Sequence, residues 1–492
     1  MNISLTIHYG EKNICLNAKK GDNLLKVLTY ANLPVHAPCG GRGVCKKCLV
    51  RAMGAYSCDE NVESGYTLIC RTTLEGDTTI YLNQENASIL ADYGMDALFT
   101  DGQEGLGVAV DIGTTTLAAF LMDMKTGRVL VSDTMLNPQR AHGADVVSRI
   151  AFSIENEENA RMLKAEIETA VRHLTDSLLQ KAGRAGERAA LYAFMGNTAM
   201  MHFALGYSAE GISKAPFAPA YTRQHMGTFL DTPAFFGGCI SGYVGADTLS
   251  AMLSAGFTDT EKTILLIDIG TNGEIALIKD GKILTCSCAA GPAFEGAHIA
   301  CGTGAVKGAI DHAKMENGKI TFSTIQNAPA AGICGSGLID IVSELVKEEE
   351  ITFMGRMDDD YYLTPDVYLS KKDVREVQLA KAALASGIQI LVNEAGIEMN
   401  DIDEVVIAGG FGSFINLESA CAIGLLPKSL FEKMRAIGNA AGEGARMALL
   451  SEKAREDLIK IQLKSSYIEL ASHPDFPDLY AENLPFLDPD DI

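Results

Sequence analysis

The tetrapeptide Asp-Ile-Gly-Thr occurs twice in this chain, at Asp111–Thr114 and again at Asp268–Thr271. Each copy follows an apolar run and precedes a second apolar run, a pattern typical of a β-hairpin with a glycine in its turn. A repeat at such a long interval indicates a duplicated supersecondary unit. We therefore expect two similar α/β lobes, and a cleft between two lobes is a natural place for a ligand.

The sequence around each copy extends the duplication. Gly107–Leu130 predicts strand, turn, strand, turn and strand, and Ile264–Leu284 repeats that order. Tyr192–Gly196 and Val405–Gly410 each add a later strand that ends in a glycine turn. We expect lobe 1 at residues 106–262, lobe 2 at residues 263–464 and a surface-packed tail at residues 465–492.

The repeated turn combines groups that bind phosphate. A strand delivers a carboxylate to the cleft, glycine lets the turn close, and threonine hydroxyls and backbone amides can contact phosphate oxygens. The arrangement resembles the actin, sugar kinase and Hsp70 ATPase superfamily, whereas no Walker-type Gly-x4-Gly-Lys-Ser/Thr motif occurs. The resemblance implies that Asp111 and Asp268 are catalytic, holding Mg²⁺ through water or positioning the attacking water. The ATP contacts it implies are Gly113, Thr114, Thr115, Gly270, Thr271, Asn272, Gly335, Ser336, Gly409, Gly410 and Gly412.

Three cysteines crowd into a glycine-rich loop before the repeats, at Cys39, Cys45 and Cys48. Glycine lets a loop wrap closely around the sulfides of an iron–sulfur cluster, so the loop predicts a [2Fe–2S] site. We expect the fourth ligand at Cys70, which follows an apolar lead-in, and Cys58 in a polar turn is its competitor. A zinc knuckle or free thiols are the alternatives to a cluster.

The residues around this loop predict a small domain at residues 1–83. Strands are expected at residues 3–9, 13–17, 49–52 and 78–82, with a helix after the N-cap Asp22. This order resembles the plant-type ferredoxin fold, a small β-grasp. The predicted fold class is therefore α/β with an α+β N-terminal domain: a β-grasp ferredoxin-like domain followed by a duplicated RNase H-like, actin-like ATPase. Polar, glycine-dotted residues 84–105 are the expected linker.

Composition narrows the classes of partner and location. The 492-residue chain has a net charge of -22, which disfavours nucleic acid and anionic membranes as partners. No apolar run is long enough to span a membrane and no signal peptide is evident, so we expect a cytoplasmic protein. Its 12 cysteines are then metal ligands and buried thiols rather than disulfides. The expected buried thiols are Cys286, Cys288, Cys301 and Cys334.

The combination of cysteine loop and repeated turns resembles the ATP-dependent reductive activators of corrinoid proteins. Met195–Met200, Cys288–Gly296 and Ile333–Gly337 also look like segments of that family. The resemblance implies reduction of a corrinoid from Co(II) to Co(I), with [2Fe–2S] as electron relay, ATP and Mg²⁺ as cofactors, and methyltransferase activation in anaerobic metabolism as the role. It implies two partners, a corrinoid protein of a methyltransferase system and a low-potential electron donor of ferredoxin or flavodoxin type, and it is compatible with a homodimer.

Three other functions stay open on the sequence. One is ATP-dependent activation of another enzyme, of the dehydratase or radical type, although such activators usually share a [4Fe–4S] cluster between two subunits. Another is a non-catalytic, redox-sensing adaptor in which the nucleotide acts only as a switch. A sugar kinase would explain the lobes and leave the cysteine loop without a purpose.

Overall fold

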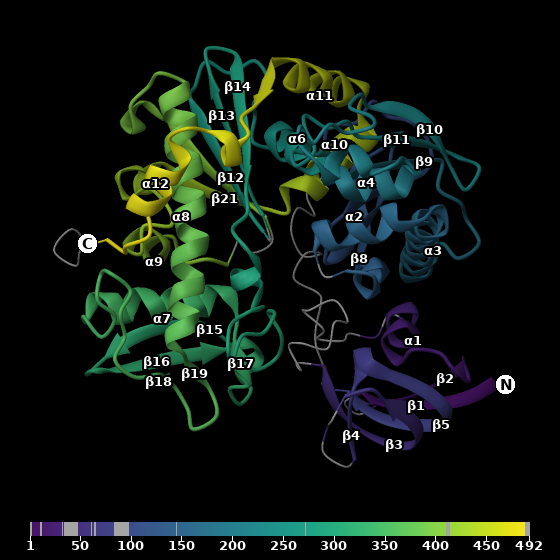
Figure 1. Ribbon diagram of the computed structural model, residues 1–492. Helices are drawn as coiled ribbons and strands as arrows, with labels where there is room; N and C mark the ends of the chain where they lie inside the picture. The colour runs from purple at the N-terminus through teal and green to yellow at the C-terminus, as the bar shows by residue number, and fades with distance from the viewer. Residues whose placement is uncertain are drawn as a thin grey trace.

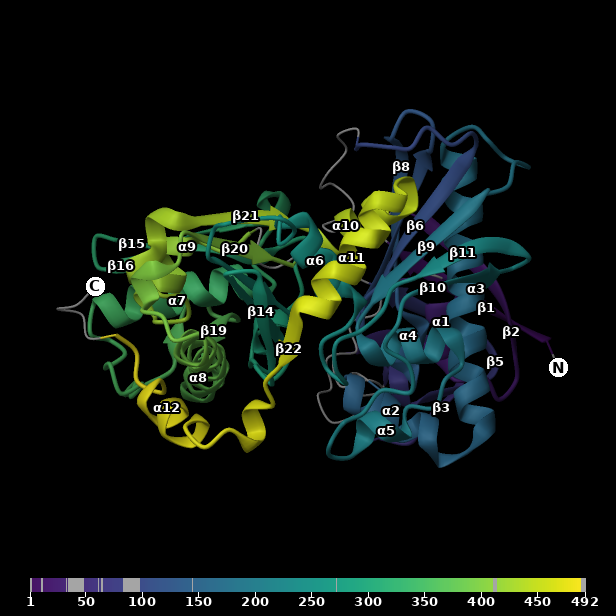
Figure 2. The ribbon, with the colours of Figure 1, turned by 90° about the horizontal axis from the view of Figure 1, so that it is seen from above.

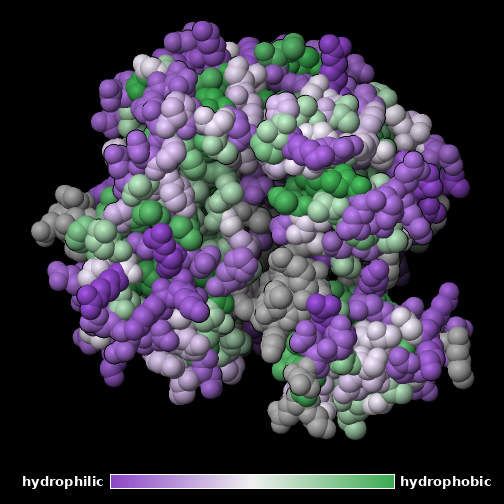
Figure 3. All heavy atoms as spheres, viewed as in Figure 1, coloured by the Kyte–Doolittle hydropathy of each residue, from purple (hydrophilic) through white to green (hydrophobic). Residues whose placement is uncertain are grey.

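The computed structural model describes residues 2–9, 12–31, 33, 48–60, 62, 65–82, 98–143, 145–270, 272–409 and 414–487. Figure 1 shows a small sheet near the N-terminus beside two larger lobes. The three main sheets have five, six and six strands. Hydrophilic residues cover most of the face seen in Figure 3, which is hollowed between the lobes. Within the described ranges, no helix combines the length and the apolar character that crossing a membrane requires.

The N-terminal sheet has the strand order β2-β1-β5-β3-β4, with β1 and β5 parallel. Helix α1 covers one face of it, and Leu24 and Leu28 of α1 join Leu5, Ile7 and Ile80 in a buried core. The elements are β1 (Asn2–Tyr9), β2 (Lys12–Lys19), α1 (Leu24–Tyr30), β3 (Leu49–Cys58), β4 (Tyr66–Leu68), η1 (Ile69–Arg71) and β5 (Thr72–Leu82).

Two details of this unit differ from the sequence prediction. Strand β3 is longer than expected because a β-bulge after Gly54 interrupts the alternation that marks a strand. The start of α1 is capped by Asn23, whose Oδ1 accepts a hydrogen bond from the Lys26 N–H at 3.3 Å. The predicted cap, Asp22, accepts instead from the backbone N–H of Lys19 at 2.8 Å.

The two lobes repeat one sheet plan, as the sequence predicts. The orders are β10-β11-β9-β6-β7-β8 and β21-β20-β12-β13-β14-β22. In each sheet the hairpin strands are antiparallel, and a later strand lies parallel beside the first, β9 beside β6 and β20 beside β12. The strands are β6 (Leu106–Ile112), β7 (Thr116–Asp123), β8 (Arg128–Leu136), β9 (Leu191–Gly196), β10 (His225–Phe229), β11 (Thr232–Phe236), β12 (Ile264–Ile269), β13 (Gly273–Lys279), β14 (Lys282–Cys288), β20 (Glu404–Ala408), β21 (Met434–Gly438) and β22 (Ser465–Tyr467).

Helices cover both sheets, and two small sheets extend the second lobe (Figure 1). The small sheets are β15 (Ala309–Glu316), β16 (Lys319–Thr324) and β17 (Gly332–Ile333), and β18 (Tyr361–Tyr362) and β19 (Tyr368–Leu369). The helices are η3 (Pro138–Ala141), α2 (Val146–Glu155), α3 (Glu157–Lys181), α4 (Thr198–Leu205), α5 (Glu210–Ser213), α6 (Ala246–Ser254), η4 (Pro292–Glu295), η5 (Ile325–Asn327), α7 (Gly335–Lys347), α8 (Lys371–Glu394), η6 (Met399–Asp401), α9 (Leu417–Ala422), η7 (Lys428–Lys433), α10 (Ala440–Leu450), α11 (Glu452–Lys464), η8 (Leu470–Ser472) and α12 (Phe476–Glu482).

Helices α10 and α11 cross from the second lobe to the first, as Figure 2 shows. Their apolar residues Ala445, Leu449 and Leu458 belong to the core of the first sheet. Helix α10 lies against α6 so closely that a Cβ on Gly444 would be 2.6 Å from the Cα of Ser250. The junction of the lobes is therefore a tightly packed helix pair.

Two segments outside the repeats are tied to the lobes. Residues 98–105 of the predicted linker dock on the first lobe, where Asp101 Oδ2 accepts from the Glu452 N–H at 2.6 Å at the start of α11. The predicted tail extends the second sheet, because β22 pairs parallel with β14, and Phe486 is buried in the second core. Residues 83–97 lie outside the described part of the chain.

Candidate functional site

The first Asp-Ile-Gly-Thr turn closes at the end of β6. The Gly113 N–H donates to the Thr116 carbonyl at 3.1 Å. A Cβ on Gly113 would lie 2.5 Å from that carbonyl oxygen, so the turn requires glycine. Asp111 precedes the turn and lies beside Met195 of the parallel strand β9.

Three side chains from other elements hold this turn, and they are Asn137, Arg149 and Asn197. Asn137 Nδ2 donates to the Gly113 carbonyl at 2.8 Å, and the Asn137 N–H donates to the Thr115 carbonyl at 2.9 Å. Buried Arg149 donates to the Thr114 carbonyl, and burial, more than nearby Arg140, lowers the Arg149 pKa to about 9.

The third side chain, Asn197, leaves the Thr114 hydroxyl free to donate its proton at the turn. Asn197 caps α4, and its Nδ2 donates to the Thr114 hydroxyl at 2.8 Å. Because this hydroxyl accepts from Asn197, its own proton is the group it can offer to a ligand oxygen.

The second turn repeats this plan at the end of β12. The Gly270 N–H donates to the Asn272 carbonyl at 3.0 Å, and Asp268 pairs in register with Glu274 on β13. Gly409, at the end of β20, has φ +90°, and a Cβ there would lie 2.5 Å from Asp268 Oδ1. The glycine therefore lets the backbone after β20 approach the carboxylate. Thr271, Gly410 and Gly412 lie outside the described residues.

Four carboxyl groups from the two lobes influence one another where the two turns meet. They are Asp111 and Asp247 of the first lobe and Asp268 and Glu274 of the second. Burial is the main cause that raises the pKa of Asp111 and Asp268 to about 7, followed in each case by the charge of Asp247. Burial also raises the pKa of Asp247 to about 6 and that of Glu274 well above its usual range. Packing acids together in this way disfavours their charged forms.

Asn439 adds an amide to this group of acids. Its Oδ1 accepts from the Gly442 N–H at 2.8 Å and caps α10, while the side chain lies close enough to Asp111 to lower the pKa of that carboxyl. Its Nδ2 is buried, and no described residue accepts a hydrogen bond of normal geometry from it, so the amide acts on the Asp111 carboxyl from a longer distance.

These groups fit a hard divalent cation with a ligand beside it. Carboxylate oxygens suit Mg²⁺, whose charge would offset the repulsion among the acids, and the buried Nδ2 of Asn439 can donate to a ligand oxygen. In the described ranges no three His, Cys, Asp or Glu side chains are already arranged around a common metal position. Water-mediated binding, which Mg²⁺ prefers, is compatible with that spacing.

The sequence prediction missed Asp247, Glu274 and Asn439. Glu274 had a signal, because an acid on an otherwise apolar strand, directly after the second turn, is unusual. Asn439 also had one, since Gly438-Asn439-Ala440 resembles Gly196-Asn197-Thr198, and both asparagines cap helices. Asp247 stands at the start of an ordinary helix, and nothing local distinguishes it.

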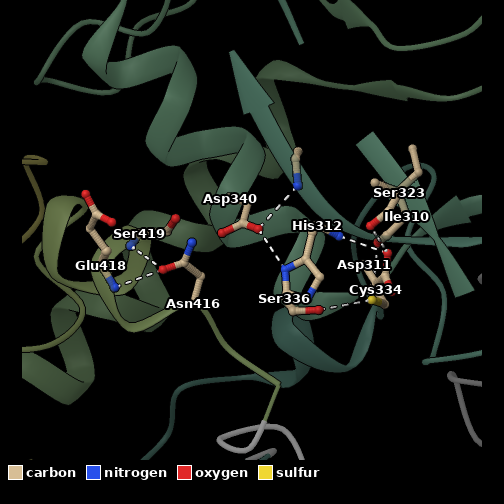
Figure 4. Close-up of polar contacts among 11 residues, drawn as sticks. Ile310, Asp311, His312, Ser323, Cys334, Ser336, Asp340, Asn416, Glu418 and Ser419 are labelled. Carbon is tan, nitrogen blue, oxygen red and sulfur yellow. Dashed lines mark hydrogen bonds and ion pairs between the residues drawn. The ribbon is translucent and has the colours of Figure 1, made fainter. Parts of the chain in front are cut away.

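The predicted residues Gly335 and Ser336 begin α7 and are buried. Ser336 Oγ lies 3.4 Å from Cys334 Sγ, as Figure 4 shows. A turn further along α7, Asp340 Oδ2 accepts from His312 Nδ1 at 3.2 Å and anchors β15 to the helix. The start of α7 is therefore packed into the second lobe.

Two of the described cysteines lie next to each other in the N-terminal unit. Cys48 and Cys70 are buried, and their Sγ atoms are 3.3 Å apart. The competitor, Cys58, ends strand β3 opposite Thr72 and is partly exposed. Cys39 and Cys45 lie outside the described residues. Of the four expected buried thiols, Cys286, Cys288 and Cys334 are confirmed as buried, whereas Cys301 is partly exposed.

The two close thiols fit a metal that takes sulfur ligands. Two sulfurs bound tetrahedrally at about 2.3 Å from one metal are separated by roughly 3.7 Å. The observed separation is 3.3 Å, and Cys48 and Cys70 flank the two strands at the open end of the β3–β4 hairpin, where Leu49 pairs with Leu68. The pair can therefore serve as two ligands of one metal ion.

Known proteins resemble this chain over almost its whole length. Residues 106–260 match the family described as the RACo middle region, and residues 262–491 match the C-terminal domain of RACo, the ASKHA domain. The chain is 30% identical to the corrinoid activation enzyme RamQ of Eubacterium limosum, over 94% of this chain and 96% of that protein. It is 26% identical to a Co(II) methylated amine-specific corrinoid protein reductase of Methanosarcina barkeri, over 76% of each chain.

A solved structure gives the same result for the fold. The structure titled reductive activator for corrinoid,iron-sulfur protein aligns with a TM-score of 0.71 and 26% identity, covering 98% of both chains. The sequence prediction of an actin-like two-lobe fold for the larger part of the chain is thereby confirmed. The chain therefore belongs to the RACo family of corrinoid activators.

Proposed function

We propose that this protein reduces the cobalt of a corrinoid protein from Co(II) to Co(I), in a one-electron step that ATP hydrolysis makes productive. The names of its relatives, a corrinoid activation enzyme and a corrinoid protein reductase, support the reaction class. The observation that carries the proposal is the joint presence of a buried cysteine pair and two acid-bearing glycine turns on one chain.

The electron relay is assigned to the N-terminal unit, which we propose to be a ferredoxin-like domain at residues 1–83. Cys39, Cys45, Cys48 and Cys70 would hold a [2Fe–2S] cluster, which supplies one-electron chemistry at a potential of roughly −400 mV in plant-type ferredoxins. The 3.3 Å separation of Cys48 and Cys70 supports their assignment to one iron. The partial exposure of Cys58 and its place at the end of a strand weigh against that residue.

The nucleotide is assigned to the space between the two turns. Asp111 and Asp268 would hold Mg²⁺, which supplies positive charge against the phosphates when it is bound. Thr114 can donate its hydroxyl proton to a phosphate oxygen, and we propose the same contact for Thr115 and Thr271. The close approach of Gly409 to Asp268 supports a backbone contact with the nucleotide there, a role that we extend to Gly410 and Gly412. Gly270 and Asn272 shape the second turn.

We assign ATP a driving role because the proposed electron transfer to Co(II) runs uphill. An uphill one-electron transfer costs roughly 1.4 kcal/mol for each ~60 mV. Because Asp111 and Asp247 belong to one lobe and Asp268 and Glu274 to the other, ligand binding between them favours a closed arrangement of the lobes. Closure that depends on the nucleotide can favour one redox complex over another.

The matched family regions, 106–260 and 262–491, support a division of the ATPase near residue 262. We retain the proposed lobes at residues 106–262 and 263–464, the linker at residues 84–105 and the tail at residues 465–492. A homodimer and a donor of ferredoxin or flavodoxin type belong to the same proposal.

The test is anaerobic absorbance of the cluster-loaded protein mixed with a Co(II) corrinoid methyltransferase component and a chemical reductant, with and without Mg-ATP. We expect the Co(I) band only when Mg-ATP is present. A reduced cluster with no Co(I) in any condition would contradict the proposal and direct attention to another acceptor enzyme.

A further inference from the structure

One face of the N-terminal sheet is covered by α1, and the other carries a row of exposed side chains. The row runs across four strands: His8 pairs in register with Tyr81, Tyr81 with Arg51, and Arg51 with Tyr66. The His8 and Tyr81 rings stack with centroids 4.6 Å apart, and Arg51 Cζ lies 5.2 Å from the Tyr81 centroid. We call these four residues the aromatic row.

Apolar side chains flank the aromatic row. Met53 and Leu49, on the same strand as Arg51, are 52% and 47% exposed, and Tyr66 and Tyr81 are 39% and 37% exposed. Tyr, Met and Arg are enriched at protein interfaces, and hot spots favour Tyr and Arg. The stacking already holds His8, Tyr81 and Arg51 in place, so a partner would order few new side chains on binding.

The N-terminal unit carries fewer acidic residues near the aromatic row than the rest of the chain does. Residues 23–58 contain no Asp or Glu, in a protein whose net charge is -22. Arg51 belongs to the aromatic row, whereas Lys26 belongs to α1 on the other face, and Arg42, Lys46 and Lys47 of this stretch lie outside the described residues. On the same face of β5 as Tyr81, Asp77 accepts from the Ser4 N–H and Glu75 pairs with Lys20; Asp77 stands two residues before Thr79, the register partner of Met53, so both acids precede the aromatic row along the strand. An acidic partner is therefore repelled by most of the molecule, whereas at the aromatic row itself it meets the guanidinium of Arg51.

The aromatic row and the cysteine pair lie on opposite faces of the same sheet, since Leu49 is exposed beside the row whereas Cys48 and Cys70 are buried in the core that α1 covers. Leu49 directly follows Cys48 in sequence and pairs in register with Leu68, one residue before η1, which contains Cys70. The Ile69 N–H donates to the Cys48 carbonyl at 3.0 Å. The opposite side of the unit faces the first lobe: α1 lies between the small sheet and that lobe in Figure 1, and it contacts η3. A partner on the aromatic row would thus be separated from the cysteines by the thickness of one sheet and would not obstruct the lobes.

We propose that the aromatic row, with Leu49 and Met53, is the docking surface for an acidic one-electron carrier protein that reduces the N-terminal unit. This inference rests on the proposed function, since it requires a redox centre at Cys48 and Cys70. The step moves one electron from the reduced carrier to the oxidised centre, with no bond or proton transferred. The corrinoid protein is assigned to the lobes, because its engagement has to respond to the nucleotide.

The experiment measures bleaching of the oxidised, cluster-loaded full-length protein in an anaerobic stopped-flow instrument, with no corrinoid or ATP present. Two reductants are compared: a purified, reduced acidic ferredoxin and the reduced methyl viologen cation. The test variant is Arg51→Glu. The control is Arg161→Glu, a similar reversal on α3, where Arg161 is well exposed.

For Arg51→Glu we expect the ferredoxin rate to fall about tenfold or more at low salt, in the range that electrostatic steering produces. The viologen rate should be unchanged or higher, because the small cation has no use for the docking surface. Arg161→Glu should match wild type with both reductants. High salt should shrink the difference between Arg51→Glu and wild type with ferredoxin.

Met53→Glu serves as an independent second variant, in case Arg51→Glu disturbs the cluster spectrum. Wild-type ferredoxin rates in both variants would overturn the proposal. So would a variant that reacts normally with ferredoxin but forms Co(I) slowly with viologen and Mg-ATP, because that face would then belong to the corrinoid protein. If viologen bleaches nothing even in wild type, the proposed cluster itself fails, which is a different result.

Discussion

The close crossing of α10 and α6 makes Gly444→Ala a sharp test of how the lobes are joined. A methyl group on Gly444 would lie 2.4 Å from Ser250 Cβ and 2.6 Å from both Ser250 Cα and its carbonyl oxygen. Non-bonded carbon atoms normally approach to about 3.5–4.0 Å. Since two of the three atoms are backbone, the helices must move apart by roughly the difference, about 1 Å.

The expected cost follows from two opposing terms. Overpacking costs about 1–3 kcal/mol, and replacing a helical glycine by alanine returns about 1 kcal/mol. The net loss is therefore up to about 2 kcal/mol, or a fall of a few degrees in Tm by thermal shift. The matched control is Gly387→Ala within α8, where the nearest atom is Ile275 Cδ1, a movable side-chain end, at 2.8 Å. Its Tm should stay close to wild type.

Gly444→Ala also tests the proposed nucleotide site around Asp111. Asp247 is near the start of α6 and Asn439 caps α10, so separating the helices displaces both from Asp111. Isothermal titration calorimetry should show weaker Mg-ADP binding by Gly444→Ala and unchanged binding by Gly387→Ala. A Gly444→Ala protein with wild-type Tm and wild-type Mg-ADP affinity would refute the reasoning about this helix pair.

Three further changes have defined outcomes. Asp268→Ala should keep the visible cluster spectrum and lose ATP-dependent Co(I) formation, measured by absorbance; unchanged Co(I) formation would remove Asp268 from the mechanism. Cys70→Ser should destroy or distort the cluster spectrum while Cys58→Ser leaves it intact, and the reverse pattern would assign the fourth ligand to Cys58. Burial lowers the Lys381 pKa from 10.5 to about 8, so the unfolded chain binds more protons between these pH values and stability rises with pH there. Lys381→Met should therefore raise Tm more at pH 7 than at pH 10, and equal changes at the two pH values would contradict this assignment.

Much of the ATPase plan could be predicted from local sequence. The glycines of the two repeated turns are required by contacts within a few residues, such as Gly113 against the Thr116 carbonyl. Apolar runs around them predicted the hairpins, and the observed sheets repeat the same order. Local signals failed where two residues competed for one role, since Asn23 rather than Asp22 caps α1.

The N-terminal unit shows a different limit. The sequence placed β3 correctly at its start but not at its end, because the bulge after Gly54 shifts the alternation of inward and outward residues. The aromatic row could not be predicted either. His8, Arg51 and Tyr81 become neighbours only through the register of three strands that are distant in sequence.

The sequence by itself determined the repeated turns, the cysteine spacing and the acidic charge, since each depends on residues close together in the chain. Only the tertiary structure brought Asp247 and Asn439 to Asp111, because α6 and α10 cross at the junction of the lobes. It also decided that α10 and α11 return to the first lobe. The physical reason is that a carboxyl group's pKa and a buried amide's partner depend on neighbours in space, which local sequence does not specify.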